Sequence, residues 1–304
     1  MSLILSSAPH VRSRDNTQRL MLNVIISLLP CVIAGIYYFG WRALLVIGVS
    51  VASAVAAEFV WQTLAHQKVR IDDLSAVVTG LLLGLIVPPS APWWMMVIGS
   101  VFAIIVVKQL FGGIGDNFLN PALTARAVLL ASWPALMTSG YNVGKFDAVS
   151  GATPLLSGAS ICDLLVGKVP GAIGETCKIA ILLGFAYLLI TRTIRWEIPV
   201  ITLATACLLG WALGYDPLTT VLSGGLLFGA VYMATDYVTT PMTRFARVLY
   251  SVGIGVIVVL IRKFGSYPEG VTYAILLMNI AAPLFDRIPA QRIYGYAQAK
   301  KEGK

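Results

Sequence analysis

Gly80-Leu-Leu-Leu-Gly-Leu-Ile-Val-Pro-Pro-Ser-Ala-Pro92 is the stretch from which the fold can be inferred. It is an apolar run with two glycines four residues apart, and it ends in a segment that prolines keep from being helical. Gly225-Leu-Leu-Phe-Gly229 repeats the apolar part, and a second break, Asp236-Tyr-Val-Thr-Thr-Pro241, follows it. Each copy then continues into a long apolar run that closes on a basic residue and a glycine: Lys108 before Gly112, and Arg262 before Gly265. The shared order of features predicts two related halves.

The composition indicates that these runs lie in a membrane. Of 304 residues, 58% are hydrophobic and only 12% are charged, and the mean hydropathy is +0.82. Several apolar runs approach or exceed the ~18 residues typical of a membrane span. Ten spans can be drawn, at about 20–39, 43–65, 72–87, 92–111, 119–136, 172–191, 197–214, 218–236, 246–263 and 269–285.

Because each half has an odd number of spans, the second half must be inverted relative to the first. We therefore expect an all-α integral membrane protein of ten transmembrane helices, arranged as two inverted five-helix repeats with interrupted third and eighth helices. The expected units are a cytoplasmic N-terminal segment at 1–19, a first repeat at 20–136, an extracytoplasmic loop at 137–171, a second repeat at 172–286 and a cytoplasmic tail at 287–304.

The basic residues predict the orientation. With the N-terminus inside, most Lys and Arg residues fall at cytoplasmic ends of the spans, as the positive-inside rule requires. The net charge of +8 therefore reports topology, and no nucleic-acid partner is expected. We predict a multi-pass protein of the bacterial inner membrane with both termini in the cytoplasm and the 137–171 loop outside.

Asp147-Ala-Val-Ser-Gly-Ala-Thr-Pro-Leu-Leu156 lies in that loop. Gly151 and Ala152 leave the backbone bare, so that a bulky group could approach it. Pro154 biases Thr153 toward an extended conformation, which would hold the threonine hydroxyl out from the loop. Asp147 and Ser150 add an acid and a second hydroxyl. Taken alone, the stretch could also be an ordinary solvated loop.

Gly112-Gly-Ile-Gly-Asp-Asn-Phe-Leu-Asn-Pro-Ala122 is the second candidate site. The glycines, among them Gly112 and Gly113, break the chain, and Asn120 reads as an N-cap with Pro121 in the first helical position. Free backbone N–H groups at a helix start, with Asn117 and Asn120 beside them, could bind the polar edge of a ring or a phosphate. An ordinary capped loop is the alternative.

Five ionisable residues lie in or near the predicted spans, where a buried charge is costly. For Glu58, Lys108 and Arg126 the sequence leaves the role open. Asp236 and Asp286, at the predicted cytoplasmic ends of the eighth and tenth spans, are candidates for an ion path. Helix-end capping, or pairing with Arg244, Arg247 or Arg287, is the alternative for both. The four cysteines are scattered without a Cys-x-x-Cys pair, so no metal site is expected.

The sequence resembles the membrane subunits RnfD and NqrB. Asp147–Thr153 matches their flavinylation motif, Asp-x-x-Ser-Gly-Ala-Thr, and Gly112–Ala122 matches a second pattern of the family. Further matches are Ser7-Ala-Pro-His10, Met233-Ala-Thr-Asp236 and Ala282-Pro-Leu-Phe-Asp286. The short N-terminal segment favours RnfD. Tyr237 departs from the pattern, because a proline is expected after Asp236.

The resemblance implies an electron-transfer subunit of an ion-pumping (Na⁺ or H⁺) ferredoxin–NAD oxidoreductase complex. FMN would be joined through its phosphate to Thr153, with Asp147, Ser150, Gly151 and Ala152 around it, by an extracytoplasmic flavin transferase. It also implies a second, non-covalent flavin, riboflavin. Other subunits would bind NAD and ferredoxin, and no catalytic side chain is expected in this chain.

Two other functions fit parts of the sequence. An NqrB-like subunit would pass electrons to quinone instead of NAD. The inverted repeat and broken helices alone would also suit a channel or transporter for a small solute, without a redox cofactor.

Overall fold

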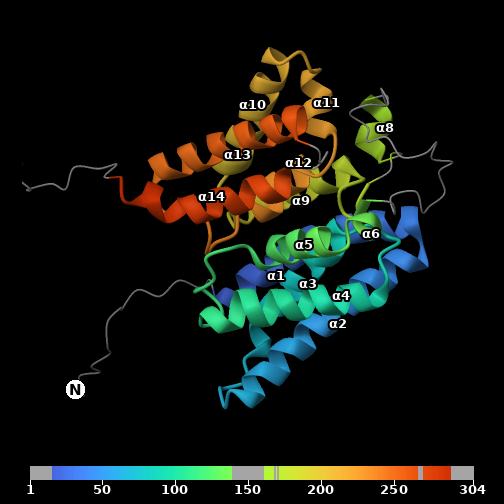
Figure 1. Ribbon diagram of the computed structural model, residues 1–304, viewed down its shortest axis with the longest axis vertical. Coiled ribbons are helices and arrows are strands. Elements are labelled where there is room, and N and C mark those ends of the chain that lie inside the picture. The colour runs from blue at the N-terminus through green and yellow to red at the C-terminus, as the bar shows by residue number, and fades with distance from the viewer. Residues whose placement is uncertain (1–15, 139–160, 168, 170, 266–269, 289–304) are drawn as a thin grey trace, which may run out of the picture.

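The computed structural model describes residues 16–138, 161–167, 169, 171–265 and 270–288, and every regular element in these residues is a helix (Figure 1). The predicted all-α class is therefore confirmed for the described residues. The predicted flavin-attachment stretch, Asp147 to Thr153, lies outside them, and so does most of the predicted terminal segments at 1–19 and 287–304.

The helices follow the apolar runs of the sequence. The first half contains α1 (Thr17–Phe39), α2 (Trp41–Leu64), the 3-10 turn η1 (Ile71–Asp73), α3 (Ser75–Ile86), α4 (Trp93–Val101), the π-helix η2 (Phe102–Lys108), the 3-10 turn η3 (Gln109–Phe111), α5 (Pro121–Ser132) and α6 (Pro134–Thr138). The short α8 (Ile161–Val166) precedes the second half. That half contains α9 (Lys178–Ile190), α10 (Glu197–Ala212), α11 (Pro217–Leu222), α12 (Leu226–Phe228), the π-helix η4 (Gly229–Met233), α13 (Arg244–Phe264) and α14 (Val271–Asp286).

Four of these helical runs are long and apolar enough to cross a membrane: α1, α2, the run Trp93–Phe111 and α13. At 1.5 Å per residue, the 23 residues of α1 span about 34 Å, enough for a hydrocarbon core of about 30 Å. The other apolar helices, such as α3 with 12 residues, are shorter. The length and composition of these four helical runs confirm an integral membrane protein, whereas ten spans and two inverted repeats stay predictions.

The proline-rich break is observed where it was predicted, at 88–92, but it follows α3, which is continuous, so the third helix itself is not interrupted. Gly80 serves close packing instead, since a Cβ on it would lie 2.7 Å from the Cα of Val51 in α2. Ser50 of α2 donates a hydrogen bond to the Gly80 carbonyl, 2.8 Å away.

The non-helical stretch predicted at 236–241 is observed, but the eighth span also contains a break that was not predicted. Its helix stops after Leu222 and resumes at Leu226, and between them Gly224 has a φ of +60°. Because L-residues with side chains rarely adopt positive φ, a glycine suits this break.

The two halves meet along two pairs of helices (Figure 1). α1 packs along α9, and α5 contacts α14. Within the halves, α2 packs on α3 and α4, and α10 packs on α13. Small residues let α9 approach α1 closely: a Cβ on Gly184 would collide with the Tyr232 hydroxyl and the Ser27 carbonyl.

Hydrogen bonds between distant segments define two opposite ends of the helix bundle. At the first, called here the Asp236 end, Asn23 of α1 bonds Thr193 after α9, and the Tyr237 hydroxyl donates to the Thr193 carbonyl. At the second, the Glu175 end, the Tyr38 hydroxyl donates to the Val166 carbonyl. Helix ends at the Asp236 end enclose the candidate site.

Candidate functional site

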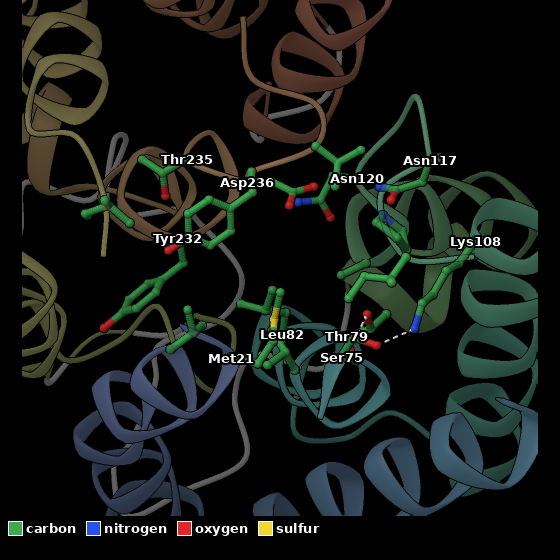
Figure 2. A pocket seen from close by; sticks show the side chains of 18 of the residues that line it. Met21, Ser75, Thr79, Leu82, Lys108, Asn117, Asn120, Tyr232, Thr235 and Asp236 are labelled. Atoms are coloured by element: carbon green, nitrogen blue, oxygen red, sulfur yellow. Dashed lines mark hydrogen bonds between the residues drawn. The ribbon is translucent and has the colours of Figure 1, made fainter. Parts of the chain in front are cut away.

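A cavity opens between the two halves at the Asp236 end. It holds about 770 Å³ of space free of protein atoms, part of it open to solvent. Figure 2 shows Ser75, Thr79 and Lys108 on one side, Tyr232 and Thr235 on the other, and Asn120 and Asp236 between them. The rest of the wall is largely apolar and includes Met21, Val24, Val78, Leu82, Ile114, Leu188, Ile194 and Val231. Mostly apolar walls with a few polar groups are typical of sites for small organic ligands.

Both π-helices end at this cavity. Lys108 is the last residue of η2, and η4 carries Tyr232 shortly before Thr235 and Asp236. A π-turn adds a residue to the helical turn and so changes which side chains face inward, and such turns are frequent at functional sites. The two halves therefore contribute equivalent irregularities to the same cavity.

The glycine-rich turn between η3 and α5 has the predicted form. Gly112, Gly113 and Gly115 have φ values of +125°, +101° and +100°, which explains why glycines occupy these positions. These glycines shape the turn and do not line the cavity.

Asn120 caps α5 as predicted, with Pro121 in the first turn. Its side-chain oxygen accepts from the Leu123 N–H, and its amide nitrogen donates to the Met233 carbonyl at the end of η4, 3.3 Å away. Asn120 thus joins the two halves at the cavity wall. Its side-chain oxygen and its amide nitrogen each already form a hydrogen bond within the protein.

The side-chain amide of Asn117 forms fewer hydrogen bonds to described residues than that of Asn120. Its side chain is 6% exposed, lines the cavity and donates to the Leu119 carbonyl at 3.0 Å. Its side-chain oxygen accepts no hydrogen bond from any described residue. Asn117 therefore supplies an acceptor that a ligand with an N–H group could use.

Asp236 lies in the turn that follows η4, partly exposed on the cavity side. Its Oδ2 accepts from the Thr239 hydroxyl at 3.3 Å, and the Asp236 carbonyl accepts from the hydroxyl of Thr240. No cationic side chain of the described residues forms an ion pair with it. The carboxylate is thus held by its own turn.

The structure does not bring Asp286 into this cavity. Its carboxylate accepts from the backbone N–H groups of Met242 (3.0 Å) and Thr243 (3.1 Å), just before α13 begins. This is the capping alternative that the sequence allowed. The role of Asp286 in an ion path stays a prediction, and its observed contacts are those of a structural group.

Three residues whose roles the sequence left open lie in buried ion pairs. Lys108 Nζ is 2.7 Å from Glu58 Oε1, and Arg126 is 3.0 Å from Glu175 Oε1. The first pair borders the cavity, whereas the second lies at the Glu175 end, beside the break before α12. Pairing of this kind offsets part of the cost of burying a charge inside a membrane protein.

Sequence reasoning missed Glu175, Ser75 and Tyr232. Ser75 accepts a hydrogen bond from Lys108, and Tyr232 donates to the Ser27 carbonyl of α1. These partners lie 33 and 205 residues apart in the chain, and no local pattern marks them. The one usable signal was Glu175 itself, an acid close to a long apolar run.

Comparison with known proteins assigns the family. Residues 4–295, nearly the whole chain, match the model of the NQR2, RnfD, RnfE family. The chain belongs to the NQR2, RnfD, RnfE family. The pattern from Gly112 to Ala122 that suggested this family is thus the turn and helix start at the cavity wall.

Three relatives match over 93% or more of their length. The chain is 46% identical to the D subunit of the Na⁺-translocating ferredoxin:NAD⁺ oxidoreductase complex of Acetobacterium woodii, over 100% of this chain and 99% of that protein. It is 39% identical to the D subunit of the proton-translocating ferredoxin:NAD⁺ oxidoreductase complex of Clostridium ljungdahlii, over 93% of each. A third relative, the D subunit of the ion-translocating oxidoreductase complex of Erwinia tasmaniensis, is 37% identical over 99% of this chain and 100% of that protein.

Proposed function

We propose that this chain is the membrane subunit that carries electrons through an ion-translocating ferredoxin:NAD⁺ oxidoreductase complex. The observation that carries the proposal is the cavity between the halves, lined by residues of the family pattern, in a chain whose full-length relatives bear that name. Soluble partner subunits would exchange electrons with ferredoxin and NAD. The chain would hold flavins in fixed positions between them.

The first proposed flavin is FMN, joined as a phosphoester to Thr153, with Asp147, Ser150, Gly151 and Ala152 around it. The support is the match of Asp147–Thr153 to the flavinylation motif. An extracytoplasmic transferase would attach it, since α6 and α8, which flank this stretch, lie at the Glu175 end.

The second proposed flavin is riboflavin, held in the cavity at the Asp236 end. The cavity suits such a group: apolar side chains such as Leu82 and Val24 could pack on the rings, and the Asn117 oxygen could accept from a ring N–H. The flavin supplies the redox chemistry, and the protein binds, orients and shields it.

The proposed topology has ten spans in two inverted repeats, with the Asp236 end in the cytoplasm. The pairing of α1 with α9 and of α5 with α14 suits a two-fold axis between the halves. Exposed basic residues among those described gather at the Asp236 end: Arg19, Lys68, Arg70, Arg192, Arg195, Arg244 and Arg287. The Glu175 end exposes Arg42 and Lys263. This asymmetry agrees with the positive-inside rule.

For the ion path we propose Asp236, a carboxylate at the mouth of the cavity without a bound cationic side chain among the described residues. Oxygen ligands suit hard cations such as Na⁺. The relatives do not determine the cation, because one is named for Na⁺ and another for protons.

The decisive experiment separates the two flavins by their attachment. The protein is purified from its native membrane and denatured. We expect free riboflavin in the supernatant and a protein mass raised by one FMN less water. Thr153→Val should abolish the in-gel flavin fluorescence but leave the released riboflavin unchanged. A wild-type protein with neither flavin would overturn the proposal and favour a transporter without a redox cofactor.

A further inference from the structure

Lys108 is the only lysine or arginine that lines the cavity among the described residues. Its Nζ donates to Ser75 Oγ at 2.5 Å and to Glu58 Oε1 at 2.7 Å. Only 3% of Lys108 and 1% of Glu58 is exposed, so that solvent screens neither charge well. The pair is a fixed dipole in a region of low dielectric.

The dipole has a defined direction. Lys108 lines the cavity and Glu58 does not, so the positive end faces the cavity (Figure 2). Glu58 is held behind it: Oε1 also accepts from Gln109 at 2.7 Å and from Gln62 at 3.4 Å. Glu58 Oε2 is buried and has no hydrogen-bond partner among the described residues. The hydrogen bonds that this carboxylate accepts from the described residues therefore all go to Oε1, which faces the two amide groups and the ammonium group.

The end of η2 fixes this direction. The chain reverses directly after Lys108, through η3 and the glycine turn, and the Gly113 N–H bonds to the Lys108 carbonyl at 3.0 Å. The backbone of Lys108 is thus tied to the turn whose family pattern continues to Asn117 and Asn120. Lys108 and the amide groups of the cavity wall are therefore positioned by one continuous segment.

We propose that Lys108 sets the electron affinity of the flavin in this cavity. The inference rests on the proposed function, because it requires riboflavin at this site. Each electron brings a negative charge, and a nearby buried cation stabilises that charge and raises the midpoint potential. Glu58 partly cancels the effect from behind. Electrons come from and leave to the neighbouring redox groups of the complex, and Lys108 forms and breaks no covalent bond.

The test is a redox titration of the full-length chain in detergent with riboflavin bound. A Thr153→Val background leaves the cavity flavin as the only flavin of the chain. We expect Glu58→Gln to raise the midpoint potential above that of the parent, because the cation then acts alone. The double variant Lys108→Met/Glu58→Gln should lie below the parent, and Lys108→Arg, which keeps the charge, should stay near it.

The double variant guards against misfolding. Removing one partner of a buried ion pair leaves an uncompensated charge, whereas replacing both with neutral side chains of similar size is often tolerated. Arg244→Gln is the control, because Arg244 is an exposed cation at the same end and its charge is screened by solvent. Its midpoint potential should equal that of the parent.

The outcomes are distinct. If the Thr153→Val chain binds no riboflavin at all, the proposed second flavin is wrong and the inference falls with it. If riboflavin binds and the potentials of Glu58→Gln and of the double variant equal the parent value, only the inference about Lys108 is overturned. A potential that falls in Glu58→Gln would also overturn it, because the sign would be opposite to that of a cation facing the flavin.

Discussion

Tyr237 ties the turn that carries Asp236 to the end of α9. Its hydroxyl donates to the carbonyl of Thr193, a residue that also bonds Asn23 of α1 through its own hydroxyl. A proline, which the resemblance led us to expect at this position, could not make this contact. Tyr237 therefore joins two segments that are distant in the sequence.

Tyr237→Phe should remove that bond and keep the ring. We expect a loss of about 1 kcal/mol of stability, as for a typical hydrogen bond. The turn beside the cavity should then loosen, and bound riboflavin should dissociate faster, which stopped-flow fluorescence would measure. Tyr38→Phe is the matched control, since it removes a similar bond to Val166 at the opposite end. Equal dissociation rates in the two variants would show that Tyr237 has no special role at the cavity.

At the scale of the element, the contact of α9 with α1 depends on one missing side chain. A Cβ on Gly184 would meet both the Tyr232 hydroxyl and the Ser27 carbonyl. The carbonyl belongs to the backbone of α1 and cannot rotate away. The two helices at the boundary of the halves can approach this closely only with glycine at this position.

Gly184→Ala should therefore destabilise the protein by roughly 1–3 kcal/mol, the usual cost of overpacking. It should also displace Tyr232 and weaken riboflavin binding. Gly48→Ala on α2 is the control, because nothing lies within 4 Å of its Cβ position. Thermal unfolding in detergent would compare them, and an equal shift of Tm in both variants would contradict the packing argument.

The elements also show which features could be predicted from the sequence. The cap at Asn120 with Pro121, the glycine turn before it and the non-helical stretch at 236–241 each depend on a few neighbouring residues, and all three were predicted. The continuity of α3 was missed, because Gly80 is required by close packing against the backbone of α2, and its neighbours in the sequence do not reveal this contact. The π-turns and the partners of Lys108 and Arg126 depend on packing between distant helices, which no local pattern encodes.

At the scale of the whole molecule, the orientation in the membrane can be tested through Cys162. This cysteine lies in α8 and is exposed, whereas Cys31 is buried and Cys177 and Cys207 are half-buried. α8 belongs to the Glu175 end, which should face outward, since the exposed basic residues lie at the other end.

In a variant with the other three cysteines replaced, a membrane-impermeant maleimide should label Cys162 from outside intact spheroplasts. The label should be absent in a further Cys162→Ser variant. Labelling that requires inverted vesicles would reverse the proposed topology and place Thr153 in the cytoplasm, out of reach of an extracytoplasmic transferase.

The hydrogen bond from the Asn120 amide to the Met233 carbonyl has a consequence for biogenesis. The donor leaves the ribosome 113 residues before its acceptor. While the second half is still being synthesised, the first turn of α5 already has its cap, but the opposite wall of the cavity is missing. A flavin that reached the chain at this stage would therefore find only half of its binding surface. We expect riboflavin to load after translation is complete, and a nascent chain truncated before η4 to insert into the membrane colourless.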